Sequence, residues 1–269
     1  MNRNYPFRWG SLGEKGSSSK PNHSWYRGPG PGSEPETQAL MRLANSEKFV
    51  AAISFHTGTV AICPPYTIPG VENPAPNEAW AVAEEITAKL PAHPERYWDL
   101  RRNLYPLDGN DQDWHRFTHG TLALLVEGVD DEKGIGADRA RAIQAVRSTW
   151  QLLLDRYLEG PSVHGRVTDA VGRPVVADVT IAETVYREAE RWTSRCRDGR
   201  FDRYLAKPGR YTVRVTALGA PAVEVPVDVS RPRRALVEVA LPAALARAAR
   251  CPTPTRGEAR DGALVPIPP

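Results

Sequence analysis

Phe49-Val50-Ala51-Ala52-Ile53-Ser54-Phe55 is a short, continuous apolar run in the first quarter of the chain. An uninterrupted run of this length is typical of a strand that is buried in a parallel sheet. Thr121-Leu122-Ala123-Leu124-Leu125-Val126 is a second run of the same kind. Stretches with helical periodicity lie before, between and after these two runs. This alternation of helices and buried strands predicts an α/β fold for residues 1–160.

The predicted helices carry recognisable end signals and apolar faces. Ser33 is expected to cap the first helix, because Glu36 lies three residues further on and Pro35 is tolerated in a first turn. The last helix is predicted over 138–158, and Gly160 ends it. Its expected buried face follows spacings of three and four and consists of Ile143, Val146, Trp150, Leu153 and Tyr157.

Residues 161–241 have a different pattern, in which apolar and polar residues alternate in short segments such as 175–181. Turn signals separate these segments, among them Asp198-Gly199-Arg200 and Lys207-Pro208-Gly209. Half-buried strands at this spacing predict an all-β sandwich that forms a second domain. Residues 242–269 are rich in Ala, Arg and Pro without a periodic pattern, and they are predicted to be a disordered tail.

Composition excludes several classes of protein. The chain has 269 residues, of which 41% are hydrophobic, so a packed core is expected and wholesale disorder is not. The net charge is +3, too small a surplus to indicate a nucleic-acid partner. No stretch approaches the roughly 18 consecutive apolar residues of a membrane span.

Two polar residues stand at the expected carboxyl ends of the buried strands. His56 directly follows the first apolar run and Glu127 directly follows the second. Ligands of open α/β sheets bind at these strand ends, so a metal-capable imidazole and a carboxylate are well placed there. Apolar neighbours would raise the pKa of Glu127 toward the range of a general base. The alternatives are a hydrogen-bonded histidine at a strand end and a carboxylate in solvent.

Asn2-Arg3-Asn4 places a guanidinium group and two amides at the start of the sequence. Arginine binds carboxylates through two parallel hydrogen bonds, so this cluster is a candidate anion site. A frayed terminus is the alternative interpretation of the same residues.

Five blocks in one order together resemble the zinc carboxypeptidases. The blocks are Asn-Arg-Asn-Tyr-Pro-Phe-Arg-Trp-Gly (2–10), Tyr-Arg-Gly-Pro (26–29), Ser-Glu-Pro-Glu-Thr-Gln-Ala (33–39), Ile-Ser-Phe-His-Thr (53–57) and Thr-Leu-Ala-Leu-Leu-Val-Glu (121–127). The β-region that starts at Val163 resembles the transthyretin-like regulatory domain that often follows the catalytic domain of this family. The resemblance therefore implies a partial carboxypeptidase-like mixed sheet with flanking helices over 1–160, followed by a transthyretin-like sandwich over 161–241.

The resemblance also implies an activity and a metal. The family releases C-terminal residues from peptides with the help of Zn²⁺. His56 matches the third zinc ligand of the family, and Glu127 matches its catalytic glutamate. Glutamate in this position takes a proton from the attacking water and returns it to the leaving amine.

Four further residues match the substrate site of the family. Asn2 and Arg3 match the pair that binds the C-terminal carboxylate of the substrate. Tyr105 precedes Glu127 by 127 − 105 = 22 residues and matches the tyrosine that closes over the substrate. Gln112 falls where the specificity-pocket residue of the family lies. The expected partners are therefore the C-termini of peptides or proteins.

One departure from the family decides the functional expectation. The first two zinc ligands of the family come from a His-x-x-Glu motif upstream of the Asn-Arg block, and this chain starts at that block. We therefore expect a truncated metallocarboxypeptidase that is inactive as given. The sequence leaves its localisation open, and a full-length form is suspected to be exported to the periplasm or the cell exterior. The alternatives are a non-catalytic carboxypeptidase-like binding protein and, third, a chain that acts through its β-sandwich as an interaction module.

Overall fold

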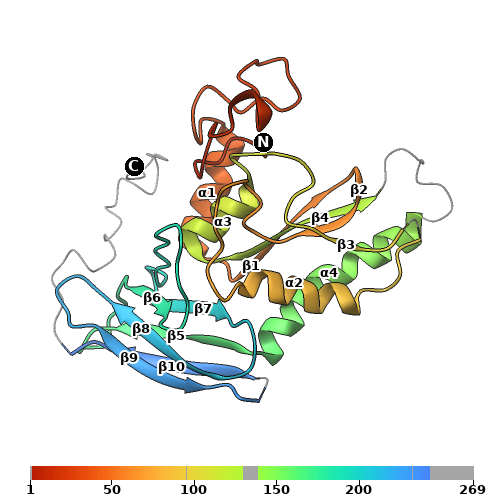
Figure 1. The fold of residues 1–269 in the computed structure, drawn as a ribbon. Helices are drawn as coiled ribbons and strands as arrows, with labels where there is room; N and C mark the ends of the chain where they lie inside the picture. The colour runs from red at the N-terminus through yellow and green to blue at the C-terminus, as the bar shows by residue number, and fades with distance from the viewer. Residues whose placement is uncertain (1, 95, 130–138, 232, 243–269) are drawn as a thin grey trace.

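The fold is described by a computed structural model that covers residues 2–94, 96–129, 139–231 and 233–242. Figure 1 shows an α/β region that comprises the first half of the chain and a β-region beside it. The tail predicted over 242–269 lies outside the described residues except for Pro242. No helix in the described part of the chain is both long and apolar enough to cross a membrane.

The two apolar runs form neighbouring parallel strands, as the sequence predicts. β1 (Ala51–His56) pairs with β4 (Leu122–Val129), and the register runs from Ala51 opposite Leu122 to His56 opposite Glu127. β2 (Thr59–Cys63) lies antiparallel on the other side of β4, and β3 (Asp99–Leu100) lies parallel to β2. The mixed sheet therefore has the order β1-β4-β2-β3.

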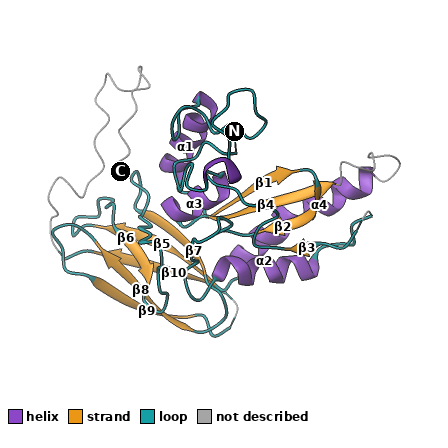
Figure 2. Cartoon of the chain, turned by 45° about the horizontal axis from the view of Figure 1, so that its top comes forward, coloured by secondary structure: helices purple, strands orange, loops and turns teal. Residues whose placement is uncertain are grey.

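Helices cover both faces of this sheet. α2 (Glu78–Lys89) and α4 (Arg139–Glu159) lie on one face, while α1 (Pro35–Glu47) and α3 (Asp111–His119) lie on the other (Figures 1 and 2). A single turn of 3-10 helix, η1 (Gly13–Lys15), interrupts the loop before α1. The core between the sheet and the α2–α4 layer is built from Ile62, Val82, Ile86, Leu122, Leu124, Val126 and Leu153.

The N-terminal end of α1 differs from the sequence prediction. Glu34 is the N-cap residue, and no side-chain hydrogen bond caps the helix. The Ser33 hydroxyl donates to Glu34 Oε1 at 2.9 Å instead, so the predicted capping box does not form. Pro35 occupies the first turn, as expected.

The buried face of α4 also differs from the prediction. Ile143 and Trp150 were expected to be buried, but they are 48% and 44% exposed. The helix lies so close to the sheet that a Cβ at Gly128 would lie 2.6 Å from Val146 Cγ2, and small side chains make this approach possible. The side chains that α4 buries are Ala142, Ala145, Thr149, Leu153, Arg156 and Tyr157.

β1 is an edge strand rather than a strand buried on both faces. It ends the strand order of the sheet, and its residues are only partly buried. Phe55 is 52% exposed. The prediction of a parallel strand was correct and the prediction of its burial was wrong, because burial depends on which elements flank a strand in three dimensions.

Residues 162–240 form two three-stranded sheets around a shared core. One sheet has the order β10-β5-β7 and consists of β5 (Ser162–Thr168), β7 (Arg200–Tyr204) and β10 (Arg234–Ala240). The other has the order β6-β8-β9 and consists of β6 (Asp178–Ile181), β8 (Arg210–Thr216) and β9 (Val223–Asp228). Both sheets contribute apolar side chains to one core, so the alternation of apolar and polar residues in the sequence places the apolar ones between the sheets. The specific likeness to a transthyretin-like domain stays a prediction.

Trp192 connects the β-region to the α/β region. The side chain is 2% exposed, and its Nε1 donates to the Phe117 carbonyl oxygen of α3 at 3.2 Å. The ring packs against Gly120, where a Cβ would lie 2.5 Å from Trp192 Cδ2. The guanidinium carbon of Arg116 lies 4.3 Å from the ring centroid. This tryptophan therefore fixes the C-terminal end of α3 to the β-region.

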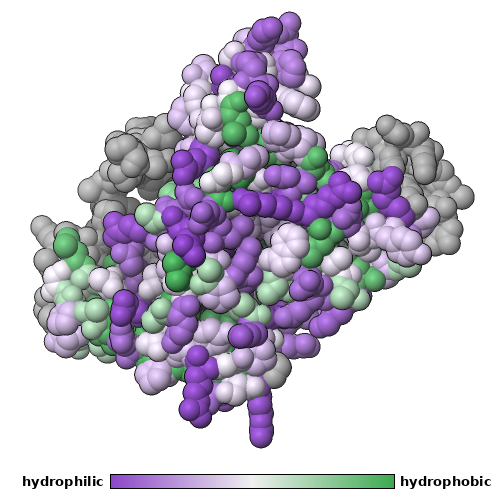
Figure 3. Space-filling model, in the orientation of Figure 1, coloured by the Kyte–Doolittle hydropathy of each residue, from purple (hydrophilic) through white to green (hydrophobic). Residues whose placement is uncertain are grey.

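The exposed surface of the molecule is mixed. On the face shown in Figure 3, hydrophobic residues occur as separate spots among hydrophilic ones. The N-terminal loop at the top of this view is largely hydrophilic, as expected for a loop that is held by hydrogen bonds.

Candidate functional site

The N-terminal segment is a fixed part of the fold and not a frayed end. Asn4 is fully buried, and its side-chain Nδ2 donates to the carbonyl oxygens of Arg27 and Gly30 at 2.7 and 3.0 Å. The Tyr5 amide donates to the Gly109 carbonyl oxygen at 2.9 Å. Gly109 has a φ of +61°, and a Cβ there would lie 2.6 Å from the Arg3 carbonyl oxygen. These contacts hold Asn2 and Arg3 in place.

Arg3 has a buried guanidinium group whose hydrogen-bond donors are only partly paired. The residue is 8% exposed, and its Nη2 donates to the Tyr105 hydroxyl at 3.4 Å. Its Nη1 donates to the Asn2 carbonyl oxygen. The buried Nε has no hydrogen-bond partner within the described ranges. Because an unpaired buried donor is costly, this geometry favours an anionic ligand.

Asn2 links this arginine to the sheet and to α3. Its side-chain Oδ1 accepts from the Asp111 amide at 2.9 Å, at the start of α3. Its Nδ2 lies 3.4 Å from His56 Nε2. The structure therefore brings Asn2, Arg3 and His56 together, although His56 lies 54 residues along the chain from Asn2.

Tyr105 lies over Arg3 from the loop before α3. The guanidinium carbon of Arg3 is 5.8 Å from the centroid of the Tyr105 ring, and the tyrosine is 39% exposed. Trp25 stacks on the tyrosine ring with a centroid distance of 5.5 Å and an interplanar angle of 1°. Tyr105 is thus placed between a tryptophan and a guanidinium group. Sequence reasoning did not identify Trp25, because no local pattern marks a loop tryptophan as a stacking partner.

His56 and Glu127 are neighbours on adjacent strands. They pair in the parallel register of β1 and β4, at the carboxyl end of β1. The structure corrects one detail, because Glu127 lies inside β4 rather than after it. The glutamate is 4% exposed, so the alternative of a carboxylate in solvent is wrong. Its negative charge helps to raise the pKa of the Cys63 thiol to about 12, although burial of that thiol is the larger cause.

His56 is held as a neutral imidazole at neutral pH. Burial lowers its pKa below the usual value, Asp111 counteracts this effect and Arg3 adds to it. Its Nε2 lies 3.2 Å from the Ser54 hydroxyl and 3.4 Å from Asn2 Nδ2. A neutral imidazole keeps a lone pair that can accept a hydrogen bond or bind a metal ion.

The first turn of α3 contributes polar atoms that lack partners. Gln112 is 1% exposed, and neither of its side-chain amide atoms has a hydrogen-bond partner in the described structure. The same holds for the buried Asp111 Oδ1. Asp113 differs, because its carboxylate accepts from the Thr67 and Ile68 amides and so anchors the helix. The Gln112 amide and Asp111 Oδ1 are therefore buried polar groups without a hydrogen-bond partner in the described part of the chain.

The described residues do not fit a three-ligand zinc site. A catalytic zinc ion takes three protein ligands and keeps a fourth position open. In the parts of the chain that the structure covers, no three His, Cys, Asp or Glu side chains come close enough to hold a metal ion. His56 is the single predicted ligand, and its Nε2 lies within hydrogen-bond distance of the Asn2 side-chain amide and the Ser54 hydroxyl.

Comparison with known proteins identifies the family. The family model for zinc carboxypeptidases matches residues 1–151, and the chain therefore belongs to the zinc carboxypeptidase family. This match covers the mixed sheet, α1, α2, α3, the first part of α4 and every candidate site residue named above. No curated protein gives a significant match.

Solved structures of carboxypeptidase type are similar to the chain. Bovine thrombin-activatable fibrinolysis inhibitor, solved with a tick carboxypeptidase inhibitor, is 22% identical, and the match covers 57% of this chain and 54% of that one with a TM-score of 0.47. Carboxypeptidase A from Helicoverpa armigera is 16% identical, with coverages of 57% and 40% and a TM-score of 0.46. The chain thus spans about half the length of these structures or less.

Proposed function

We propose that this chain recognises the C-terminal carboxylate of peptides and supplies part of a metallocarboxypeptidase active site. The observation that carries the proposal is the buried Arg3 guanidinium, which has an unpaired Nε and lies against Asn2 and Tyr105. A guanidinium fork beside an amide is suited to two parallel hydrogen bonds with a carboxylate. A free peptide C-terminus is the ligand that an exopeptidase must distinguish from internal peptide bonds.

Each binding residue has a separate part in the proposal. Arg3 binds the two oxygens of the substrate carboxylate, and Asn2 donates a further hydrogen bond through its amide. Tyr105 covers the bound residue and excludes water from the ion pair. Gln112 faces the terminal side chain of the substrate through its unpaired amide atoms. Because this amide is neutral, it provides hydrogen bonds rather than charge to the specificity pocket.

Glu127 is proposed as the general base for hydrolysis. Its carboxylate accepts a proton from the attacking water and then passes that proton to the nitrogen of the leaving amino acid. Burial beside His56 supports this assignment, because general bases act in sites that exclude bulk water. The products are a shortened peptide and a free amino acid.

The number of possible metal ligands near His56 limits what can be proposed about zinc binding. At the candidate site His56 is the one imidazole, and no three possible ligands come together among the described residues, whereas the family is named for zinc. We infer that the two remaining ligands come from outside the described residues and that residues 1–269 alone neither hold zinc tightly nor hydrolyse peptides. A non-catalytic binding protein is the second candidate function. The described residues form no cluster of three possible metal ligands, and such a protein needs none.

Binding of a labelled peptide tests the recognition step directly. A fluorescein-labelled tetrapeptide with a free C-terminus should bind at least about tenfold more tightly than its amidated form, because hydrogen bonds to charged groups contribute about 1.5–3 kcal/mol. Arg3→Gln should abolish this preference. Arg42→Gln is the matched control, since Arg42 is an exposed arginine on α1. Equal affinity for the acid and the amide would contradict the assignment of Arg3.

Metal content and turnover separate the two candidate functions. Mass spectrometry of the purified chain should find far less than one zinc ion per molecule, together with no release of C-terminal residues. Addition of an upstream segment that carries His-x-x-Glu should restore both properties for a carboxypeptidase and neither for a binding protein. In the restored enzyme, Glu127→Gln should lower the rate by at least about 100-fold without loss of zinc. One tightly held zinc ion in the 269-residue chain would show that the ligand assignment is wrong.

A further inference from the structure

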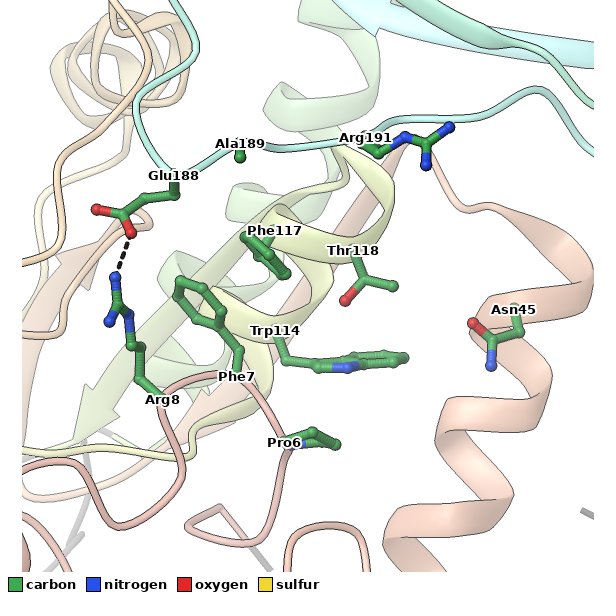
Figure 4. A pocket seen from close by; sticks show the side chains of 10 residues that line it. All are labelled: Pro6, Phe7, Arg8, Asn45, Trp114, Phe117, Thr118, Glu188, Ala189 and Arg191. Atoms are coloured by element: carbon green, nitrogen blue, oxygen red, sulfur yellow. Dashed lines mark hydrogen bonds and ion pairs between the residues drawn. The ribbon is translucent and has the colours of Figure 1, made fainter. Parts of the chain in front are cut away.

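A pocket lies between α1, α3, the N-terminal segment and the loop that leads to Trp192. Its volume is about 540 Å³, which falls within the range of small-molecule sites. The residues that line it are not the candidate site residues described above, although both sites use the N-terminal segment and α3. Figure 4 shows this pocket from close by, with the Arg8–Glu188 ion pair to one side and Asn45 of α1 on the other.

The inner wall of the pocket consists of aromatic rings that neighbouring side chains hold in place. Trp114 is 3% exposed and packs on Tyr5 with a centroid distance of 5.5 Å. Phe7 is 7% exposed and stacks on Phe117 at 4.3 Å. The Trp114 indole extends between Pro6 and Thr118 in Figure 4. Rigid aromatic walls favour a flat apolar ligand, because little side-chain freedom is lost on binding.

The mouth of the pocket carries charged side chains. Arg8 and Arg191 line it together with one carboxylate, Glu188, and Arg191 pairs with Asp178 at 2.7 Å. Glu188 Oε2 accepts from Arg8 Nη2 at 2.5 Å, and Oε1 accepts from the Glu72 amide at 3.0 Å, so both oxygens are occupied. Arg8 is half exposed, and Nη2 is the one donor of its side chain with a partner in the described ranges. The guanidinium group can therefore accept an additional anionic partner.

The backbone at the mouth supports a binding role. Arg8 and Ala189 have φ values of +53° and +57°, in the left-handed region that residues other than glycine rarely adopt. Strain of this kind is concentrated at ligand sites, where the surrounding structure compensates for it. The hydroxyl of Thr118 and the amide of Asn45 add uncharged hydrogen-bonding groups to the lining.

We infer that this pocket binds a flat aromatic ring that carries an anionic group, with the ring between Trp114 and Thr118 and the anion at Arg8. Indole-3-acetate has this chemistry in a size that the volume accommodates. The inference is independent of the proposed carboxypeptidase function, because it concerns a different cavity with different side chains.

Fluorine NMR with 5-fluoroindole-3-acetate tests the inference on the full chain. We expect 5-fluoroindole-3-acetate to bind at least about fivefold more tightly than neutral 5-fluoroindole and cationic 5-fluorotryptamine. A difference of this size is expected from one charge interaction between the carboxylate of the probe and Arg8. Thr118→Phe should fill the pocket and lower the affinity at least about tenfold. Thr87→Phe is the matched control, since Thr87 is a partly exposed threonine on α2 and should bind like the original chain.

Two further measurements keep the test decisive. Arg8→Gln, at a half-exposed side chain, should weaken binding of the acetate and leave binding of neutral 5-fluoroindole unchanged. An excess of acetyl-diglycine, which offers a free carboxylate to Arg3, should not displace the probe. Displacement by this peptide, equal binding of the three probes, or full affinity in Thr118→Phe would each overturn the inference.

Discussion

Replacement of Trp192 by alanine should weaken the contact between the β-region and the α/β region. Truncation of a buried tryptophan typically costs about 3–5 kcal/mol. The hydrogen bond to Phe117 adds about 1 kcal/mol, and the contact with the Arg116 guanidinium adds about 1 kcal/mol more. These terms overlap, so we expect a loss of about 5 kcal/mol, which is comparable to the whole stability of a small domain.

Urea denaturation measures this loss, with the two regions followed by circular dichroism and tryptophan fluorescence. The original chain should unfold in one transition, whereas Trp192→Ala should unfold in two. Trp192→Phe keeps a ring against Gly120 and should lose only about 1–2 kcal/mol. Trp150→Ala is the control at a tryptophan that is 44% exposed, and it should lose less than about 1 kcal/mol. A single transition in Trp192→Ala, displaced by less than about 1 kcal/mol, would refute the reasoning.

Three other predictions concern the fold. Residues 161–241 alone should give a sheet-type circular dichroism spectrum and a cooperative thermal transition, because both sheets contribute to one core; a coil-like spectrum would contradict this. Burial raises the pKa of Asp113 from 3.8 to about 6, so the folded state binds this proton more tightly than the unfolded state does. The contribution of this protonated carboxyl to the free energy of unfolding, up to about 3 kcal/mol, is complete below about pH 4 and is lost as the pH rises through 6. Urea denaturation of Asp113→Asn at several pH values should lack this dependence. A pH profile that is the same as that of the original chain would argue against the role of Asp113. Gly120→Ala should lower the free energy of unfolding by about 2–4 kcal/mol, because φ is +71° and the added Cβ would clash with the ring of Trp192. Gly172→Ala is the control, at a φ of +79° with open space around it, and should cost about 1 kcal/mol. Equal losses of the two variants in thermal unfolding would exclude the steric cause.

Local patterns predicted the elements and the strand direction well. The two apolar runs became the parallel pair of β1 and β4, and α4 ends at Glu159, directly before Gly160. Both signals act over a few residues, so they can be recognised without knowledge of the tertiary structure. The parallel register then places His56 beside Glu127 as a direct consequence.

Faces and exposure were harder to predict for a physical reason. On α4 a stripe of large apolar residues and a stripe of small residues both fit helical spacing, and the sheet selected Ala142 and Ala145 over Ile143 and Trp150. Alanine scores weakly as an apolar signal, yet it permits a close approach between helix and sheet. The choice between the two faces therefore depends on the distance between layers, which periodicity does not contain.

The residues of the candidate site were proposed from the family resemblance, whereas their contacts required the structure. Asn2, Arg3 and Tyr105 were identified through the family resemblance, and the structure brings them together with His56. Trp25 was missed, because only the folded chain shows that it stacks on Tyr105. The aromatic pocket was missed for the same reason, since its lining comes from four separate segments of the chain.

The exposed position of β1 has a practical consequence for work with this protein in solution. One side of the strand pairs with β4, and the other side has no strand partner in the described structure. Phe55 of β1 is exposed and lines one pocket together with the exposed side chains of Ile143 and Trp150 of α4. Such an edge can add a strand from another molecule. Concentrated stocks should therefore associate with time, and light scattering should show slower growth when Phe55→Lys places a charge on this edge.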